Sequence, residues 1–216
     1  TFQADKKNTK EVLITGGTTN YLANYVVRLN GATNVIFDGI NMSNTGGNST
    51  YTTVIRTHRP SATGITKNIT VRNAVLTGQV STYTGEYAAI VSAYCYSPGY
   101  SFPDYNRTEG LTIDNCSILN GAYGFYSRGI TSYSNENKDM TVTNCTFQGQ
   151  YYYGMLFQYS DTVTVNYNTV RFASPGYSGQ YGLLMQYCDG GIDLMDNDIV
   201  TGGTSQSYPA QITYCG

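Results

Sequence analysis

The stretch Leu111-Thr-Ile-Asp-Asn-Cys-Ser-Ile118 is one of six copies of an eight-residue pattern. Its first and third residues are apolar in every copy, and the two-residue period of a strand places them on one side. The fifth residue is Gly, Asn or Asp in all copies but one, where it is Tyr, and Gly, Asn and Asp tolerate the left-handed backbone of a bend. Each copy is therefore predicted to be a strand followed by a sharp corner. The copies cover residues 35–42, 69–76, 111–118, 140–147, 163–170 and 192–199.

The columns of this repeat predict how the copies stack. Like residues recur in register only if successive coils are parallel, at the roughly 4.8 Å separation of neighbouring strands. An antiparallel sandwich is the alternative, but its hairpins give no reason for the recurrence. We therefore predict an all-β fold, a right-handed parallel β-helix of about six full coils plus partial terminal coils. The third column is expected to form one buried file of Phe37, Val71, Ile113, Val142, Val165 and Leu194.

A second strand precedes several of the copies. Residues 89–95, 154–160 and 182–188 align with one another, and residues 210–215 begin a further copy. The alignment predicts an aromatic ladder made of Tyr94, Tyr159, Tyr187 and Tyr214.

Composition limits the function classes. Charged residues make up 12% of the chain, Gly and Tyr are abundant at 24 and 22 residues, and the net charge is −2. This balance gives no general attraction to nucleic acid, and no apolar run approaches the ~20 residues of a membrane span. Residues 1–216 are expected to be a single module of a longer polypeptide, because both ends already resemble coil and no cap is visible.

The five cysteines show no zinc-type spacing, and neither a cofactor nor a metal site is predicted. Cys116 and Cys145 fall in the column that turns inward after the bend, together with Ala74, and are expected to be buried free thiols. Cys188 and Cys215 should stack likewise. In-register parallel strands leave equivalent Cβ atoms about as far apart as Cα atoms, which disfavours a disulfide.

Acidic residues give little support for catalysis. The densest group is Asp189, Asp193, Asp196 and Asp198. The columns point Asp193, Asp196 and Asp198 in different directions, whereas glycoside hydrolysis needs carboxylates across one bond. The column of Asp38, Arg72 and Asp114 alternates in sign and is read as a surface ion ladder. The segment 56–60 holds the only histidine, and solvated charge is the favoured reading for it.

Loops on a rigid scaffold often carry function, and two segments are rich in aromatic residues: the largest insertion, around residues 94–105, and residues 151–153. Because flat tyrosine faces can stack on sugar rings, we take them as candidate ligand contacts. These residues are Tyr94, Tyr96, Tyr100, Phe102, Tyr105, Tyr151, Tyr152 and Tyr153. Packing of the loops on the helix body is the alternative reading for each.

The segments 24–41, 150–155 and 181–192 resemble the parallel β-helix repeats of very large secreted surface proteins of Bacteroidetes-type bacteria, many of them exported by the type IX secretion system. This resemblance covers nearly the whole chain and implies the pectin-lyase-like superfamily fold, an extracellular location and a structural or adhesive role. The expected function is a non-catalytic segment of a secreted cell-surface protein that contacts glycans or partner proteins through Tyr-rich loops. The alternative is a polysaccharide lyase or glycoside hydrolase of the same fold.

Overall fold

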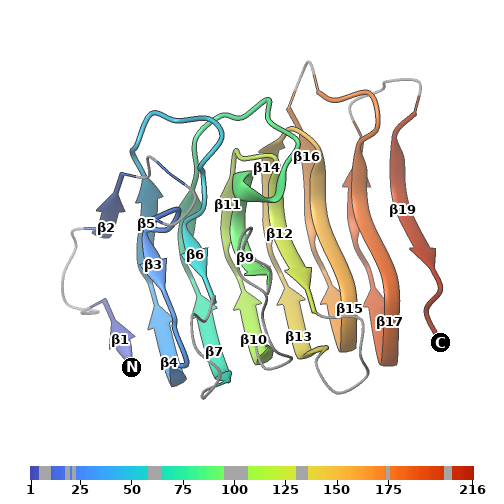
Figure 1. Ribbon diagram of the computed structural model, residues 1–216, viewed down its shortest axis with the longest axis horizontal. Helices are drawn as coiled ribbons and strands as arrows, with labels where there is room; N and C mark the ends of the chain where they lie inside the picture. Colours follow the sequence, from blue (N-terminus) through green and yellow to red (C-terminus); the bar gives the residue numbers. More distant parts are fainter. Residues whose placement is uncertain are drawn as a thin grey trace.

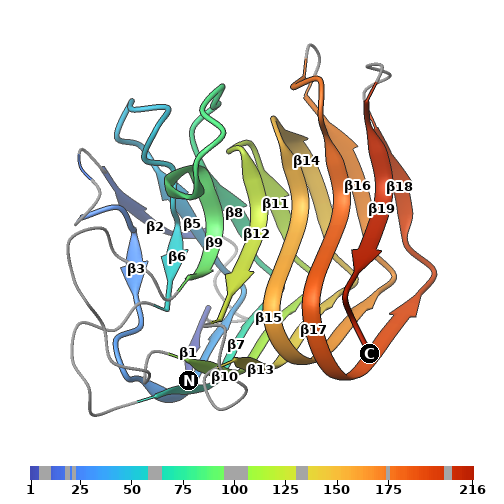
Figure 2. The ribbon, with the colours of Figure 1, turned by 45° about the vertical axis from the view of Figure 1, so that its right-hand side comes forward.

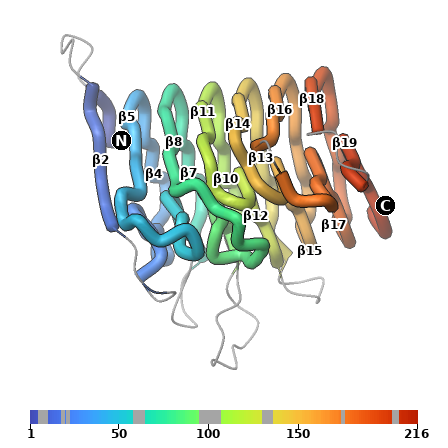
Figure 3. Tube along the Cα trace, turned by 90° about the horizontal axis from the view of Figure 1, so that it is seen from above, coloured from blue at the N-terminus to red at the C-terminus, as the bar shows by residue number. Residues whose placement is uncertain are grey.

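The computed structural model of the chain describes residues 1–4, 11–17, 20, 23–57, 65–94, 107–129, 136–173, 176–201 and 206–216. The chain winds as a parallel β-helix whose coils follow one another along the long axis, with the two termini at opposite ends (Figures 1 and 3). Every strand pair in the described part of the chain is parallel. The predicted β-helix is therefore confirmed.

Each coil contributes strands to three faces. The first face contains β1 (Phe2–Gln3), β4 (Thr33–Asp38), β7 (Thr66–Arg72), β10 (Thr108–Asp114), β13 (Asn137–Thr143) and the second halves of β15 (Tyr153–Asn166) and β17 (Tyr181–Met195). The second face contains β2 (Val12–Gly16), β5 (Ile40–Asn44), β8 (Val75–Thr77), β11 (Ser117–Leu119), β14 (Thr146–Gln150), β16 (Thr169–Phe172) and β18 (Asp198–Val200).

The third face lies forward in Figure 2 and continues into the first face, because β15 and β17 run through the corner without a break. Its strands are β3 (Val27–Arg28), β6 (Ile55–Arg56), β9 (Ala89–Tyr94), β12 (Tyr123–Arg128), the first halves of β15 and β17, and β19 (Tyr208–Thr213). A 3₁₀ turn, η1 (Glu86–Ala88), leads into β9. Within the residues that the structure describes, six coils thus have strands on all three faces, with β1 and β2 before them and β19 after them.

The predicted corner between the first and second faces is present in all six copies of the repeat. The fifth-column residues all have positive φ, between 48° and 70°. Asn, Asp and Gly adopt this region most readily, so the sequence column is explained by the backbone that it must adopt. These residues are Gly39, Asn73, Asn115, Asn144, Tyr167 and Asp196.

The third-column file is confirmed, with one correction. Consecutive members are direct strand partners from Phe37 through to Leu194, and the first five are buried. Leu194 is 37% exposed, because the second half of β17 pairs with β15 alone among the described strands. The file also extends one step further than predicted, since Phe2 stacks on Phe37 with ring centroids 5.3 Å apart.

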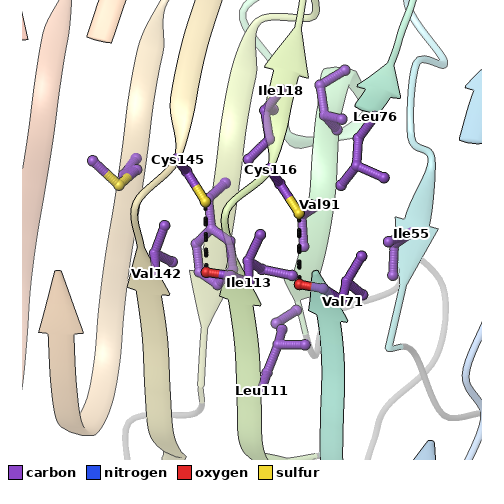
Figure 4. Close-up of a cluster of buried hydrophobic side chains, with 14 of the residues drawn as sticks. Ile55, Val71, Leu76, Val91, Leu111, Ile113, Cys116, Ile118, Val142 and Cys145 are labelled. Atoms are coloured by element: carbon purple, nitrogen blue, oxygen red, sulfur yellow. Dashed lines mark hydrogen bonds between the residues drawn. The ribbon is translucent and has the colours of Figure 1, made fainter. Parts of the chain in front are cut away.

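The sixth-column residues form a buried hydrogen-bond ladder just inside this corner. The thiols of Cys116 and Cys145 each donate to a carbonyl of the preceding coil, Val71 and Ile113 respectively, with Sγ···O distances of 3.6 Å (Figure 4). In the next coil the Nδ2 of Asn168 donates to the carbonyl of Val142 at 2.8 Å. Cysteine and asparagine therefore have the same structural role at this position: each donates a hydrogen bond to the carbonyl of the third-column residue in the preceding coil.

The cysteine geometry agrees with free thiols. Cys116, Cys145, Cys188 and Cys215 are free, whereas Cys95 lies outside the described residues. The thiol of Cys188 points back along the axis to the carbonyl of Phe157, and Cys215 Sγ lies 3.4 Å from the amide N of Cys188. Burial raises the pKa of Cys188 to about 12, which keeps it protonated and unreactive.

Thiol counting tests this arrangement. Under denaturing, non-reducing conditions we expect all five cysteines to react with a thiol reagent. The four described cysteines are free, and stacked side chains that point the same way cannot bond without distorting the coil. The same count after reduction serves as the control. A lower count before reduction than after it would show that the coil spacing permits a disulfide.

The predicted aromatic ladder is partly wrong. Tyr159, Tyr187 and Tyr214 do stack, with successive ring centroids 5.0 Å apart and planes within 5°. Tyr94 is not a member, because it pairs in register with Arg128, and Arg128 with Gln158. The strand from Ala89 is thus displaced by one residue from the predicted alignment.

Candidate functional site

The third face carries a second apolar cluster outside the coils. Phe125, Met155 and Leu183 point into the core, whereas Tyr126, Leu156 and Leu184 point outward and yet remain buried. They are covered by neighbouring aromatic side chains of the same face. The cluster consists of Ala88, Ala89, Tyr94, Ala122, Tyr123, Tyr126, Tyr153, Leu156 and Leu184, with Tyr151, Tyr152 and Tyr181 packed against it.

A stack of four tyrosines runs through this cluster and extends beyond it. Tyr123, Tyr153, Tyr181 and Tyr208 are partners on consecutive strands β12, β15, β17 and β19. Their ring centroids lie 5.0 to 5.1 Å apart, with interplanar angles of 17° to 20°. The register of the parallel strands therefore produces a continuous tyrosine stack along the helix axis.

A glycine column makes room for the core beneath this stack. Gly124, Gly154 and Gly182 follow the first three tyrosines of the stack, and all three are buried. A Cβ on Gly154 would lie 2.5 Å from the carbonyl oxygen of Gly182 and 2.8 Å from Cγ1 of Val170. A side chain at this position would collide with backbone, so glycine is required by close approach of the coils.

The described residues of the two predicted aromatic segments belong to one cluster. The Tyr94 ring meets Tyr126 edge-on at 5.2 Å, and Tyr126 meets Tyr123 edge-on at 5.0 Å. Tyr123 stacks in turn on Tyr153. Tyr94 and Tyr153 are buried, at 8% and 9% exposure, and their rings contribute packing. Tyr96, Tyr100, Phe102 and Tyr105 lie outside the described residues.

The accessible edge of the cluster is formed by three tyrosines. Tyr151 and Tyr152 are half-buried, and Tyr177 is 37% exposed. The Tyr152 ring lies 4.0 Å from Tyr153 and meets Tyr177 edge-on at 4.7 Å. Buried tyrosines thus hold the rings at the accessible edge in fixed orientations.

Burial also determines the protonation state of the phenols in the cluster. It raises the pKa of Tyr126 to about 12 and raises the pKa values of Tyr94, Tyr123 and Tyr153 well above their ordinary value. These phenols remain neutral at physiological pH. The Tyr123 hydroxyl donates to the carbonyl of Thr84 at 2.6 Å, which ties the cluster to the segment before η1.

Sequence reasoning missed Tyr123, Tyr126, Tyr177, Tyr181 and Tyr208. A signal for two of them was present, since the tripeptide Tyr-Gly-apolar occurs at 123–125, 153–155 and 181–183. No equivalent pattern marks Tyr126 or Tyr177.

Ion pairs connect acidic residues on the described surface to neighbouring coils. Asp38 bonds Arg72 at 2.9 Å, Glu109 bonds Lys67 at 2.6 Å, and Asp161 bonds Lys138 at 2.8 Å. The predicted ladder is confirmed only in its first step: Asp114 instead accepts hydrogen bonds from Thr143 and Asn144 of the next coil.

Three of the acids near the C-terminal end are dispersed, as the columns indicated, whereas the fourth, Asp189, is the strand partner of Asp161. Asp193, Asp196 and Asp198 are exposed. Asp193 accepts a hydrogen bond from Asn166 at 2.8 Å, Asp198 pairs with Arg171, and Asp196 occupies the left-handed corner.

Two further findings concern the described residues alone. No group of three or more His, Cys, Asp or Glu side chains among them is arranged to hold a metal ion. Within the same residues, no helix has the length and apolar character to cross a membrane.

Comparison of the chain with protein-family models, with curated proteins and with solved structures found no match. The fold and the surface chemistry are therefore the basis for a functional proposal.

Proposed function

We propose that the chain is a non-catalytic structural and adhesive segment of a secreted cell-surface protein. In this proposal the β-helix is a stiff rod, and the tyrosine cluster on its third face contacts glycans or partner proteins. The extracellular location rests on the resemblance to secreted β-helix repeats.

The observation that carries the proposal is the oriented aromatic edge of the third face. Tyr151, Tyr152 and Tyr177 present rings whose positions are fixed by the buried stack behind them. Aromatic rings with a polar hydroxyl are well suited to recognition, because they bury large apolar area and retain a hydrogen-bonding group. Prior ordering of the rings also lowers the entropy lost when a ligand binds.

The use of acidic residues supports a structural rather than a catalytic role. Asp38, Glu109 and Asp161 each bond a basic residue of an adjacent coil. Glycoside hydrolysis requires two carboxylates facing each other across a sugar bond, at separations of roughly 5 to 9.5 Å. In the described surface these carboxylates instead link coil to coil.

Substitution of Tyr152 tests the contact surface. We expect Tyr152→Ala to weaken binding to a neutral glycan identified on a glycan array by about tenfold, as for a contact residue at the centre of an interface. Tyr167→Ala is the matched control, because Tyr167 is 52% exposed but lies at the corner between the first and second faces. It should bind as the unmodified chain does.

The same incubations test catalysis. Chain lengths of the glycans should remain unchanged after prolonged contact with the protein. Unaltered binding by Tyr152→Ala would remove the contact surface from the proposal. Glycan shortening that disappears in Asp189→Ala or Asp193→Ala would replace the adhesive role by an enzymatic one.

A further inference from the structure

The connections that lead from the second face to the third face form one uncharged corner of the helix. Those that precede β6 and β9 are adjacent at the top of Figures 1 and 2. Charged residues make up 12% of the chain, yet Asp, Glu, Lys, Arg and His are absent from the sequence of every one of these connections. The corner between the first and second faces does carry charge, as at Asp196. The uncharged connections are residues 17–26, 45–54, 78–85, 120–122, 151–152, 173–180 and 201–207.

Two groups of accessible tyrosines lie at this corner. One is the accessible edge of the tyrosine cluster, in the connections before β15 and β17. The other comes from the connection before β6 and from the segment that leads through η1 into β9. In this second group, two rings are parallel within 3° at 6.5 Å, and the third ring lies 6.0 Å from the nearer of them. The groups consist of Tyr151, Tyr152 and Tyr177, and of Tyr51, Tyr83 and Tyr87.

Contacts between its two segments fix the second group. The Ser81 hydroxyl donates to the carbonyl of Ser49 at 2.5 Å and so joins the connection before η1 to the connection before β6. The Tyr83 ring packs against the backbone of Gly85, where a Cβ would overlap the ring. These contacts orient the rings before any ligand binds, which lowers the entropy lost on binding.

The two groups belong to one continuous surface. Thr84, next to Tyr83, accepts the hydrogen bond of the Tyr123 hydroxyl at 2.6 Å. Tyr123 stacks on Tyr153, whose ring lies 4.0 Å from that of Tyr152. The strands entered from the outermost tyrosines, β6 and β17, are four strand steps apart, or roughly 19 Å at about 4.8 Å a step. The accessible rings therefore follow a line along the helix axis that is longer than a single sugar unit.

We propose that this corner binds a linear, neutral polysaccharide that lies parallel to the helix axis and contacts tyrosines of several coils. The inference rests on the proposed function and specifies its ligand. The corner combines Tyr with Ser, Thr, Gly and Asn, which is also the composition of antibody combining sites. In such a surface tyrosine supplies rigid contact area, and the small polar residues supply adaptable hydrogen bonds.

The charges next to the corner also favour a neutral ligand. Burial and the carboxylate of Glu86 raise the pKa of Tyr87 to about 12, against the opposing effect of Arg56. These two flanking charges are opposite in sign and offset each other. Because electrostatic complementarity selects partners, a surface with this balance matches an uncharged sugar chain better than an anionic one.

Calorimetry with oligosaccharides of increasing length tests the inference. Cello-, manno- and xylo-oligosaccharides are linear and neutral, and each series runs from the disaccharide to the hexasaccharide. We expect at least one series to bind, with the hexasaccharide bound at least about tenfold more tightly than the disaccharide, because contacts after the first are intramolecular. Tyr83→Ala should remove most of this gain, whereas Tyr152→Ala should weaken binding of every member that binds.

Controls separate this effect from unfolding and from general attraction. Tyr83 is 38% exposed, so Tyr83→Ala should have the thermal unfolding midpoint of the unmodified chain. Tyr167→Ala, at the corner between the first and second faces, should keep the full gain with length. Oligogalacturonates are linear but anionic, and they should bind more weakly than the neutral series. The length series on the unmodified chain needs no variant.

Three results would overturn the inference and leave the proposed adhesive role in place. They are equal affinity for the disaccharide and the hexasaccharide, an undiminished gain with length in Tyr83→Ala, and tighter binding of oligogalacturonates than of any neutral series. Absence of binding to all three neutral series would overturn it as well. The comparison of Tyr152→Ala with the unmodified chain on the glycan array then tests the proposed function separately.

Discussion

Replacement of Phe157 by alanine is expected to lower the free energy of unfolding by about 3–5 kcal/mol, the range for a buried phenylalanine. Phe157 is fully buried inside the coil, and its ring centroid lies 5.1 Å from that of Phe125 in the preceding coil. The substitution removes apolar burial and leaves a cavity. The cavity cannot close easily, because backbone hydrogen bonds fix the spacing of neighbouring coils. The midpoint and slope of urea denaturation, followed by circular dichroism, measure the change.

The control for Phe157→Ala is Tyr214→Ala. Tyr214 is also aromatic and stacked, on Tyr187, but it is 75% exposed. Its loss should shift stability by less than about 1 kcal/mol. Similar shifts for the two variants would mean that the interior of the helix packs no better than its surface. In a solenoid each coil contacts only its neighbours, so a broadened transition for Phe157→Ala would indicate local rather than global unfolding.

Replacement of Gly154 by alanine is the smallest change with a large expected effect. The added methyl group would collide with the carbonyl of Gly182 and with Val170. Because one of these atoms belongs to backbone, adjacent coils must separate or shift, and we expect a loss of about 3 kcal/mol, the upper part of the range for overpacking. Thermal and urea unfolding of the purified variant measure the loss.

Gly191→Ala adds the same methyl group without the collision. No atom lies within 4 Å of a Cβ at Gly191, and its φ is not in the left-handed region. This variant should be as stable as the unmodified chain or slightly more stable, since alanine reduces the entropy of the unfolded state. If Gly154→Ala proved equally harmless, the close approach between coils would not be what requires glycine there.

The repeat could be predicted because its columns report two local constraints at once. Apolar residues at Ile113 and Val142 mark the inward direction, and Asn115 and Asn144 mark the left-handed corner. Both constraints act within a few residues, so they are visible in the sequence. The exposure of Leu194 was not predictable in this way, because a column gives the direction of a side chain and not whether another coil covers it.

The third face was harder to predict for a physical reason. Its register is set by Val91, Phe125, Met155 and Leu183, which are partners in the core. The sequence alignment matched Tyr94 with Tyr159 and Tyr187, whereas the core register aligns Tyr94 with Arg128 and Gln158, one position earlier. The tyrosine cluster depends on this register, and its members Tyr123, Tyr126 and Tyr181 were therefore missed.

The ion pairs show the same limit. Asp38 and Arg72 were recognised because they occupy one repeat column, whereas Lys67 and Glu109 lie before the repeat begins and pair equally well. Opposite charges do alternate along the stack, as predicted. The longest alternation is formed by Lys67, Glu109, Lys138 and Asp161, which are partners on successive strands but lie before the eight-residue repeat.

The corner between the third and first faces accepts chain segments of very different length. In two coils a single strand, β15 or β17, turns it directly, whereas residues 95–107 separate β9 from β10 at the same corner. The strands on either side keep their partners in both cases. Doubling the length of a flexible loop costs only about 0.6 kcal/mol in closure entropy. Evolution can therefore lengthen, shorten or exchange segments at this corner one coil at a time, and new recognition loops can arise while the scaffold that displays them is preserved.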